Sequence, residues 1–339
     1  MPRVTMLVNS DYAHDARVQK EALSLSRAGY DVTVFSLAMP GPRERYFNNI
    51  RVLNPTTGKM AWFPYKPVYM KAYWQVMRAL LGQGGDIWHG HDLESLPFVF
   101  LASKLRGGRL VYDAHELWQG HNWLGGGRWR RSRRLLRRIW LGAEKKLARR
   151  CHLVITVSAS CARKMAASLN IKTPLVLRNC VDPAGEHSGA GPAIREKLGL
   201  APGETIVVYS GHLKKGRGLE KLLEAWAAAR VRARLVFVGS GPLEEALRAL
   251  VFSSGLPNVH FISPVKAWEL PGFIRGASLG VVLTENNSLN SYCSLPNKVF
   301  EYIGAGLPVL ATDLPEIRGL VQQYQVGLCV NAREPKAIR

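Results

Sequence analysis

The sequence lacks several features that would assign it to whole classes of protein. No apolar run approaches the ~20 residues of a membrane-spanning helix, and residues 4–8 are too short for a signal peptide. The five cysteines include no C-x-x-C pair, which argues against a disulfide framework and a zinc site. We therefore expect a reduced, cytoplasmic protein. The loop after the first predicted strand has no G-x-G-x-x-G, so a dinucleotide fingerprint is absent.

Acidic residues are scarce. The chain has 25 Asp and Glu against 46 Lys and Arg, a net charge of +21 at pH 7. Such a balance indicates a polyanionic partner: nucleic acid, an anionic membrane surface or a phosphorylated substrate. The sequence contains no recognition-helix or RNA-binding signature, which makes nucleic acid the least favoured of the three.

The order of elements predicts two α/β domains in 339 residues. A strand at 4–9, an amphipathic helix ending at Gly29 and a strand at 31–36 open a doubly wound parallel sheet. A linker at 181–193, rich in Gly, Pro, Ser and Ala, separates a domain at 1–180 from one at 194–339. Residues 40–85 are less regular. Their aromatic run at 62–74 either lines a groove for a substrate or covers the sheet edge.

Two predicted strand ends in the first domain carry polar side chains that suit ligand binding. Ligands of open α/β sheets gather at the carboxyl ends of the strands. The residues are His89, His91, Asp92, Asp113, His115 and Glu116. Histidines and carboxylates are also metal ligands, but no H-E-x-x-H spacing accompanies them.

The second domain contains two predicted phosphate-binding segments. Gly211–Gly218 is a basic, glycine-bounded loop between a strand and a helix, although its order is not that of a P-loop. Residues 294–309 read as a helix followed by a buried strand, with Ser294 as the cap and Pro296 in the first turn. Lys298 adds a charge at the helix start, and Glu301 suits the two hydroxyls of a ribose.

These segments resemble the retaining glycosyltransferases of family 4, which have the GT-B fold. The pattern S-x-P-x-K-x-x-E-Y-x-x-x-G-x-P-V at 294–309 is similar to their nucleotide-sugar site. D-x-x-H-x-H-D at 86–92, D-x-H-E at 113–116 and the opening segment 15–34 also resemble the family. The resemblance implies two Rossmann-like domains facing a cleft, and transfer of a sugar from a nucleoside diphosphate donor with retention at the anomeric carbon.

The resemblance also implies roles for individual residues. His115 and Glu301 are the expected catalytic residues, and Glu301 also binds the donor ribose. The expected diphosphate ligands are Arg217, Lys298, Gly211 and His212, with Val265 near the donor base. On the acceptor side we expect His91, Asp92 and Glu116. With no D-x-D pair in the sequence, we expect no metal and no other cofactor. The expected partners are a nucleoside diphosphate sugar and a glycan or lipid-linked acceptor.

The sequence departs from the family pattern in three places. Cys293 stands where many relatives carry a second acid, and His212 stands where many have Arg. The chain ends where the family usually continues with one or two helices, as in a truncated chain. The alternatives are therefore a non-hydrolysing sugar-nucleotide epimerase of similar fold and a non-catalytic basic binding protein.

Residues 128–150 form a predicted basic amphipathic helix. Its apolar stripe is Leu136, Ile139, Trp140, Ala143 and Leu147, and Glu144 is its one acid. Such a helix is typical of contact with anionic lipid headgroups, and a solvated surface helix is the alternative. A peripheral position on the inner face of the membrane is the corresponding hypothesis, which Trp123 and Trp129 favour.

Overall fold

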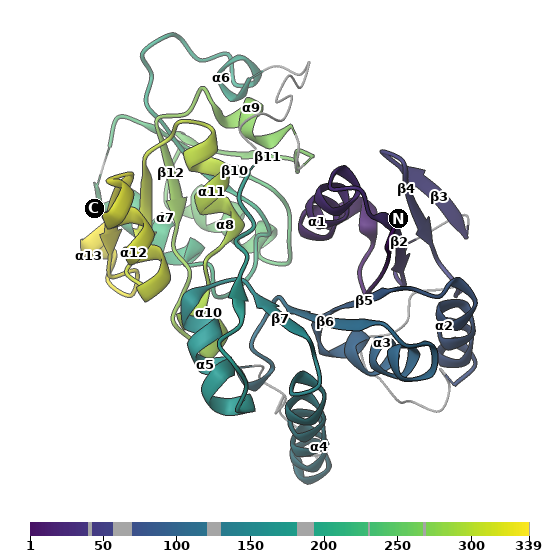
Figure 1. Cartoon of the computed structure of the whole chain (residues 1–339). Coiled ribbons are helices and arrows are strands. Elements are labelled where there is room, and N and C mark those ends of the chain that lie inside the picture. The colour runs from purple at the N-terminus through teal and green to yellow at the C-terminus, as the bar shows by residue number, and fades with distance from the viewer. Residues whose placement is uncertain are drawn as a thin grey trace. The chain divides into compact units, whose positions relative to one another are not determined.

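The computed structural model describes residues 1–39, 43–56, 70–120, 130–181, 193–229, 231–266 and 269–338. The chain divides into two compact units, Met1–Arg178 and Asn179–Arg339 (Figure 1). The division falls beside the expected boundary at 180. Most of the expected linker, residues 182–192, lies outside the described residues.

The first unit is built on one eight-stranded sheet with the order β3-β4-β2-β1-β5-β6-β7-β8. Every neighbouring pair is parallel except β3 and β4. Its strands are β1 (Arg3–Val8), β2 (Asp31–Ser36), β3 (Glu44–Phe47), β4 (Ile50–Leu53), β5 (Ile87–His91), β6 (Arg109–Ala114), β7 (Leu153–Thr156) and β8 (Leu175–Val176). Its helices are η1 (Tyr12–His14), α1 (Ala16–Arg27), α2 (Met70–Gln83), α3 (Asp92–Arg106), η3 (Trp118–Gly120), α4 (Arg130–Ala148) and α5 (Ala159–Leu169).

The second unit has a six-stranded, fully parallel sheet with the order β11-β10-β9-β12-β13-β14. Its strands are β9 (Ile206–Ser210), β10 (Arg234–Val238), β11 (Val259–Ile262), β12 (Leu279–Val282), β13 (Val309–Thr312) and β14 (Gly327–Val330). Its helices are α6 (Ile194–Lys197), α7 (Leu219–Ala229), α8 (Glu244–Ser253), α9 (Leu270–Ile274), α10 (Leu289–Cys293), α11 (Asn297–Gly304), α12 (Pro315–Tyr324) and α13 (Pro335–Ile338). Two apolar clusters cover the two faces of this sheet, because strands buried on both sides leave no polar face. The prediction of two Rossmann-like parallel sheets is confirmed.

The region 40–85 is more regular than its sequence indicates. β3 and β4 form an antiparallel hairpin, and the Asn48–Asn49 turn between them has positive φ at both residues, 48° and 65°. Two left-handed central residues are characteristic of the tight hairpin turns that suit the twist of a sheet. Most of the aromatic run lies outside the described residues. At its end, Tyr73 is buried against Phe98 while Trp74 is exposed.

The start of the 294–309 segment differs from its prediction. Ser294 does not cap α11; it ends the preceding short helix α10, where its hydroxyl donates to the carbonyl of Ser291. Pro296 is the N-cap residue of α11 rather than part of its first turn, and α11 has no side-chain cap. The sequence did not predict α10, whose N-cap is Ser288, and two helices therefore meet where one was expected.

Among the described residues, no helix combines the length and the apolar composition that a membrane span requires.

Candidate functional site

In the second unit, the Gly211–Gly218 loop is held against its neighbours by backbone contacts. The Gly211 N–H donates to the carbonyl of Val238, and the Leu213 N–H donates to that of Ser240. At Gly218 (φ +65°) a Cβ would lie 2.6 Å from the carbonyl oxygen of Leu283. The glycine is required there because a side chain would collide with backbone. These contacts therefore hold the loop in one position at the carboxyl end of β9.

Tyr302 fixes helix α11 beside this loop. Its hydroxyl accepts hydrogen bonds from the Ser210 N–H at 2.8 Å and the Ser210 hydroxyl at 3.1 Å. Its ring lies so close to Gly280 of β12 that an added Cβ would sit 2.3 Å from ring carbons. The residue is fully buried. The sequence pattern contained Tyr302, but this role was not predicted.

Lys298 lies between the loop and the start of α11. Its Nζ is 3.7 Å from the centroid of the Tyr209 ring, and a Cβ on Gly211 would be 3.4 Å from that Nζ. Burial and the charges of Arg217 and Lys214 together lower the pKa of Lys298 to about 7, against the opposing charge of Glu301. An anion that binds beside a lysine in this setting stabilises the charged form of the lysine.

Lys298 has the charge of Glu301 nearby but no direct ion pair among the described residues. In the part of the chain that the structure describes, no carboxylate forms an ion pair with Lys298 or Arg217. The first-turn N–H groups of α11 have no side-chain cap. Two basic side chains beside an uncapped helix N-terminus are an arrangement that can bind an anion such as a phosphate.

We expect nucleoside diphosphate binding to take up a proton between pH 7 and pH 9. An anion beside Lys298 raises the lysine pKa toward its ordinary value, so the bound state holds a proton that the free state has partly lost. Affinity for UDP or GDP then falls as pH rises through this range. Calorimetry at pH 8 in buffers of different ionisation enthalpy measures the uptake. Equal apparent enthalpies in all buffers would contradict the expectation.

The other predicted donor residues are placed as follows. His212 is exposed, with Nδ1 2.9 Å from the carbonyl oxygen of Ser240. Val265 follows β11 and packs its half-buried side chain on the core, which leaves its backbone for a ligand. Glu301 is half-buried in the second turn of α11. Cys293 is fully buried, so at this position the chain offers a ligand neither an acid nor an exposed side chain.

In the first unit, the predicted strand-end residues form one buried cluster around Asp113. Arg17 of α1 donates to both carboxylate oxygens of Asp113, at 2.9 and 2.8 Å. His115 Nε2 lies 3.1 Å from Asp113 Oδ2, and His91 Nδ1 lies 3.4 Å from the same oxygen. Burial alone would raise the pKa of Asp113, but hydrogen bonds from His115, His91 and Arg17 hold it well below its usual range.

His115 is a cation at neutral pH. Burial would lower its pKa, but Asp92 and Asp113 outweigh burial and raise the pKa to about 10. Asp92 accepts the His115 N–H at 2.9 Å, and its other oxygen is 3.4 Å from Nδ1 of the ring. Asp92 begins α3 with a left-handed backbone, φ +60°. An aspartate pays about 1 kcal/mol for this conformation and is tolerated there. Glu116, which follows His115, is exposed.

Arg17 and Glu21 were not predicted as part of this cluster. They lie four residues apart on α1, with Arg17 Nε 3.0 Å from Glu21 Oε1. The opening segment that contains them resembled the family, but charged residues at this spacing usually face solvent. The sequence did contain one signal for their role. The predicted helix that carries them follows the first strand, so its start lies at the carboxyl edge of the sheet, where ligands gather.

The cluster also contains a set of side chains that could hold a metal ion. One ligand atom from each of Glu21, His89, His91 and Asp113 lies within 4.8 Å of the others. The donor set suits zinc, but the Arg17 guanidinium already pairs with Asp113 and lies 3.0 Å from Glu21. A dication would have to sit beside this fixed positive charge, so these residues fit a metal poorly.

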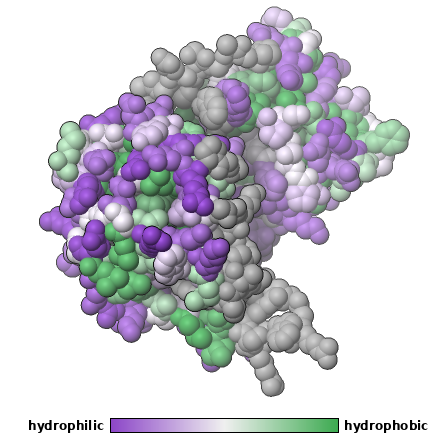
Figure 2. All heavy atoms as spheres, turned by 90° about the vertical axis from the view of Figure 1, so that its right-hand side faces the viewer, coloured by the Kyte–Doolittle hydropathy of each residue, from purple (hydrophilic) through white to green (hydrophobic). Residues whose placement is uncertain are grey.

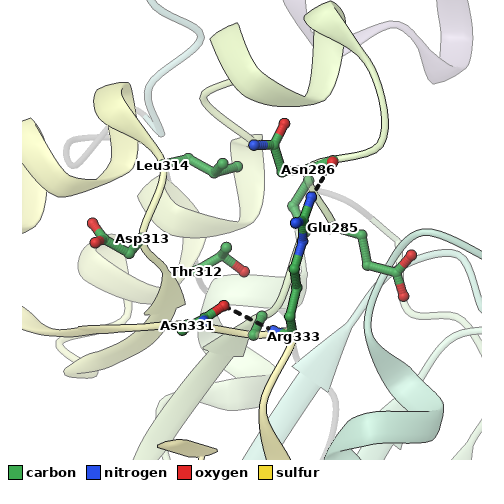
Figure 3. Close-up of a pocket in the computed structure, with 9 residues that line it drawn as sticks. Glu285, Asn286, Thr312, Asp313, Leu314, Asn331 and Arg333 are labelled. Atoms are coloured by element: carbon green, nitrogen blue, oxygen red, sulfur yellow. Dashed lines mark hydrogen bonds between the residues drawn. The ribbon is translucent and has the colours of Figure 1, made fainter.

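A separate hollow of about 330 Å³ opens at the ends of β12, β13 and β14 (Figure 3). Arg333 crosses it and donates to the carbonyl of Asn286 at 3.1 Å, while its own N–H donates to Asn331. In the close-up, the carboxylate of Glu285 points away from these groups (Figure 3). The predicted donor residues do not line this hollow.

Comparison with known sequences assigns the two units separately. Residues 17–184 match the family described as Glycosyltransferase Family 4, and residues 204–339 match Glycosyl transferases group 1. Over 98% of its length the chain is 24% identical to chitobiosyldiphosphodolichol beta-mannosyltransferase of Mus musculus, covering 80% of that protein. It is 26% identical over 153 residues to the putative colanic acid biosynthesis glycosyl transferase WcaI of Escherichia coli, covering 43% of this chain and 36% of that one.

Solved structures agree on the fold. Sucrose-phosphate synthase from Thermosynechococcus elongatus has a TM-score of 0.79 at 18% identity, covering 100% of this chain and 88% of that one. WaaG, a glycosyltransferase involved in lipopolysaccharide biosynthesis, has a TM-score of 0.66 at 18% identity, covering 99% and 90%. HepE of Anabaena, in complex with UDP and glucose, has a TM-score of 0.69 at 17% identity, covering 100% and 88%. The sequence matches, the two sheets and the strand-end motifs all support one assignment. The chain belongs to the family 4 glycosyltransferases and has the GT-B fold.

Proposed function

We propose that this enzyme takes its sugar from a nucleoside diphosphate sugar and passes it to a glycan or lipid-linked acceptor. The observation that carries the proposal is the cationic site at the start of α11, where Lys298 and Arg217 form no ion pair with a carboxylate among the described residues. Lys298 and Arg217 bind the diphosphate with the Gly211–His212 backbone, and Glu301 binds the ribose. The base lies along the backbone at Val265.

His115 acts at the sugar, and its charge bears on the stereochemistry. Held as a cation by Asp92 and Asp113, it has no free pair with which to accept the proton of an acceptor hydroxyl. In the proposed reaction the leaving phosphate accepts that proton, the donor bond to phosphate breaks, and the acceptor oxygen bonds on the same face, with retention. The protein contributes position and charge stabilisation. His91, Asp92 and Glu116 lie on the acceptor side.

The mouse relative is named for a β-mannosyl product, so the anomeric configuration is a point to measure. Nuclear magnetic resonance of the product, started from an α-linked donor, distinguishes the outcomes. An α-glycoside supports retention. A β-glycoside would show inversion and require a base other than His115.

The first experiment is a thermal-shift screen of UDP- and GDP-sugars with the whole chain. A ligand at one hundred times its Kd stabilises the folded state by about 2.7 kcal/mol, enough to identify the base. Stabilisation by one nucleotide series, without consumption of the donor in the absence of acceptor, supports a transferase. No shift with any nucleotide would overturn the donor-site assignment, and an epimerised donor would show the alternative enzyme.

We expect transfer to proceed without a divalent metal. The cations around the diphosphate site, together with the absence of a D-x-D pair, give the charge neutralisation that a metal would otherwise supply. Activity after dialysis against EDTA should equal that of the untreated enzyme within about twofold. Loss of activity with EDTA and its return with Mg²⁺ or Mn²⁺ would contradict the expectation.

We further propose that helix α4 holds the enzyme on an anionic membrane surface. Trp140 stacks on Trp118 and the buried Glu144 accepts from Tyr112, so one face of α4 is fixed to the first unit. The opposite side exposes Leu135 (60%) and Ile139 (58%). Of the predicted apolar stripe, Trp140 is buried and Ile139 faces outward. Trp123 and Trp129 lie outside the described residues.

The exposed residues of α4 alternate basic and apolar side chains. Arg134 and Arg138 are exposed next to Leu135 and Ile139. In this arrangement the arginines can contact lipid headgroups while the two apolar side chains reach the acyl chains. Figure 2 shows the face of the molecule that carries α2, where hydrophobic patches interrupt a mostly hydrophilic surface. Leu135 and Ile139 offer only a modest apolar area for insertion into the membrane. The proposed binding of α4 to the membrane is therefore mainly electrostatic.

We expect the double variant Arg134→Glu/Arg138→Glu to release the enzyme from anionic vesicles at low salt. Each basic residue near the surface contributes about 1 kcal/mol, so reversing two charges weakens partitioning by at least tenfold. Cosedimentation with phosphatidylserine vesicles measures this, with neutral vesicles for comparison. The control Arg27→Glu/Arg232→Glu changes the net charge equally at two exposed arginines elsewhere. Equal release by both variants would show that only net charge matters.

A further inference from the structure

Arg17 uses its donors in a way that leaves Glu21 without one. Its Nε, which carries a single hydrogen, donates to Asp113 Oδ2, and Nη2 donates to Asp113 Oδ1. Nη1 donates to the carbonyl of Leu177 at 2.7 Å. Glu21 Oε1 is only 3.0 Å from the same Nε, yet the hydrogen there is directed at Asp113. The carboxylates of Asp113 and Glu21 thus both lie within 3.0 Å of Arg17 Nε, and Asp113 accepts the one hydrogen bond that this N–H donates.

Among the described residues, no other cationic side chain contacts Glu21. Its side chain is 9% exposed, and both carboxylate oxygens are buried without a hydrogen-bond donor among the described residues. The nearest histidine nitrogen, His89 Nε2, is 3.7 Å from Oε2 and is itself buried and unpaired within the described structure. An ionised carboxylate in this position would be desolvated and adjacent to a second negative charge.

We propose that Glu21 is a neutral carboxylic acid in the folded enzyme and a positioning residue for His115. A neutral Glu21 leaves the guanidinium of Arg17 entirely to Asp113. Asp113 then stays in place to hold the imidazolium of His115 at 3.1 Å. An ionised Glu21 would compete for Arg17 Nε and loosen Asp113 from both of its cations.

Ionisable groups face Glu21 from each packed element, and the two cations among them, Arg17 and His115, favour its ionised form. The groups are Arg17 on α1, His89 and His91 on β5, Asp113 on β6, Asp92 at the start of α3, and His115 after β6. Burial and the charge of Asp113 raise the pKa of Glu21 to about 9, against the opposing charge of Arg17. Burial lowers the pKa of His89 and His91, so both rings are neutral. With Glu21 neutral, Arg17 and His115 balance Asp113 and Asp92.

Infrared spectroscopy tests the protonation directly. The enzyme is labelled with ¹³C at glutamate carboxyls, and its spectrum at pH 7 is compared with that of Glu21→Gln. The carbonyl stretch of a protonated acid, which ionised carboxylates lack, should be present in the wild type and reduced in the variant. Glu94, whose pKa burial raises to about 8, is the matched control: Glu94→Gln should leave the Glu21 band in place. A wild-type spectrum that loses only ionised carboxylate signal in Glu21→Gln would overturn the proposal.

Histidine resonances test the positioning role. The His115 ring signal, assigned by its loss in His115→Gln, should titrate above pH 8 in the wild type and in Glu21→Gln, which keeps a neutral group of the same shape. Glu21→Ala should lower that titration by at least one pH unit. Where Glu21→Ala does not fold, Glu21→Met replaces it. Unchanged titration in the truncated variant, or a Glu21→Gln variant that behaves like it, would overturn the role.

The same samples exclude the alternative of a metal site. Equilibrium dialysis with Zn²⁺ should show no stoichiometric uptake that Glu21→Gln abolishes, and such uptake would overturn the proposal in favour of a metal centre at Glu21, His89, His91 and Asp113. The benefit to catalysis rests on the proposed function. These measurements need neither donor nor acceptor, so their failure leaves the transferase assignment standing.

Discussion

Asp113→Asn is expected to destabilise the first unit by about 3–5 kcal/mol, since removing one partner of a buried pair leaves an uncompensated charge. Asp113 is fully buried and is the shared counter-ion of Arg17 and His115. The amide keeps the volume but removes the charge, and its NH₂ group faces N–H donors. Urea unfolding followed by circular dichroism measures the change.

The matched control is Asp313→Asn. Asp313 pairs with Arg318, but both side chains are about half exposed, so the loss is expected to stay below about 1 kcal/mol. Comparable losses in both variants would contradict the importance of the buried cluster.

The pH dependence of stability gives an independent check on Asp113. A carboxyl whose folded pKa is depressed stabilises the fold above its unfolded value and loses that contribution as pH falls. His115 behaves in the opposite way: its contribution is complete below about pH 6.5 and disappears as pH rises toward 10. In Asp113→Asn both trends should weaken together, because the two groups form one hydrogen-bonded pair.

Lys298→Met is expected to weaken binding of the donor nucleotide by about ten- to hundredfold while the fold is retained. A hydrogen bond to a charged group is worth about 1.5–3 kcal/mol, and about 1.4 kcal/mol corresponds to tenfold in affinity. Methionine keeps the length and packs on Tyr209, where the lysine now lies. Calorimetric titration with whichever of UDP and GDP stabilises the wild type measures the effect.

Lys197→Met controls for the loss of one positive charge from the same unit. Lys197 is exposed at the end of α6 and should leave affinity within about twofold. Undiminished affinity in Lys298→Met would show that the diphosphate binds elsewhere.

Sequence patterns named candidate residues at strand ends and helix starts, and the structure places them there. Asp113 lies at the end of β6, His115 follows that strand, and Lys298 lies in the first turn of α11. The hairpin around Asn48 and Asn49 was missed because its strands have four residues each and expose alternate side chains. Ser294 was misplaced because the short helix α10, which was not predicted, ends at this serine.

The missed members of the cluster have a different explanation. Glu21 lies on α1 four residues after Arg17, and the approach of β5 and β6 to this side of the helix encloses both side chains. For Ile139, helical spacing defines an apolar stripe without saying which residues of the stripe meet the protein. Contacts between elements far apart in sequence decide both cases.

The bond between Ser210 and Tyr302 joins residues 92 positions apart and has a consequence for folding. During synthesis, the loop after β9 leaves the ribosome long before β12 and α11 exist, so it has neither the ring of Tyr302 beneath it nor Lys298 beside it. Parallel pairing between strands far apart in sequence forms slowly, because the chain between them must lose conformational entropy before the stabilising contacts form. The candidate nucleotide site is therefore complete only after α11 has been made and has packed against the loop.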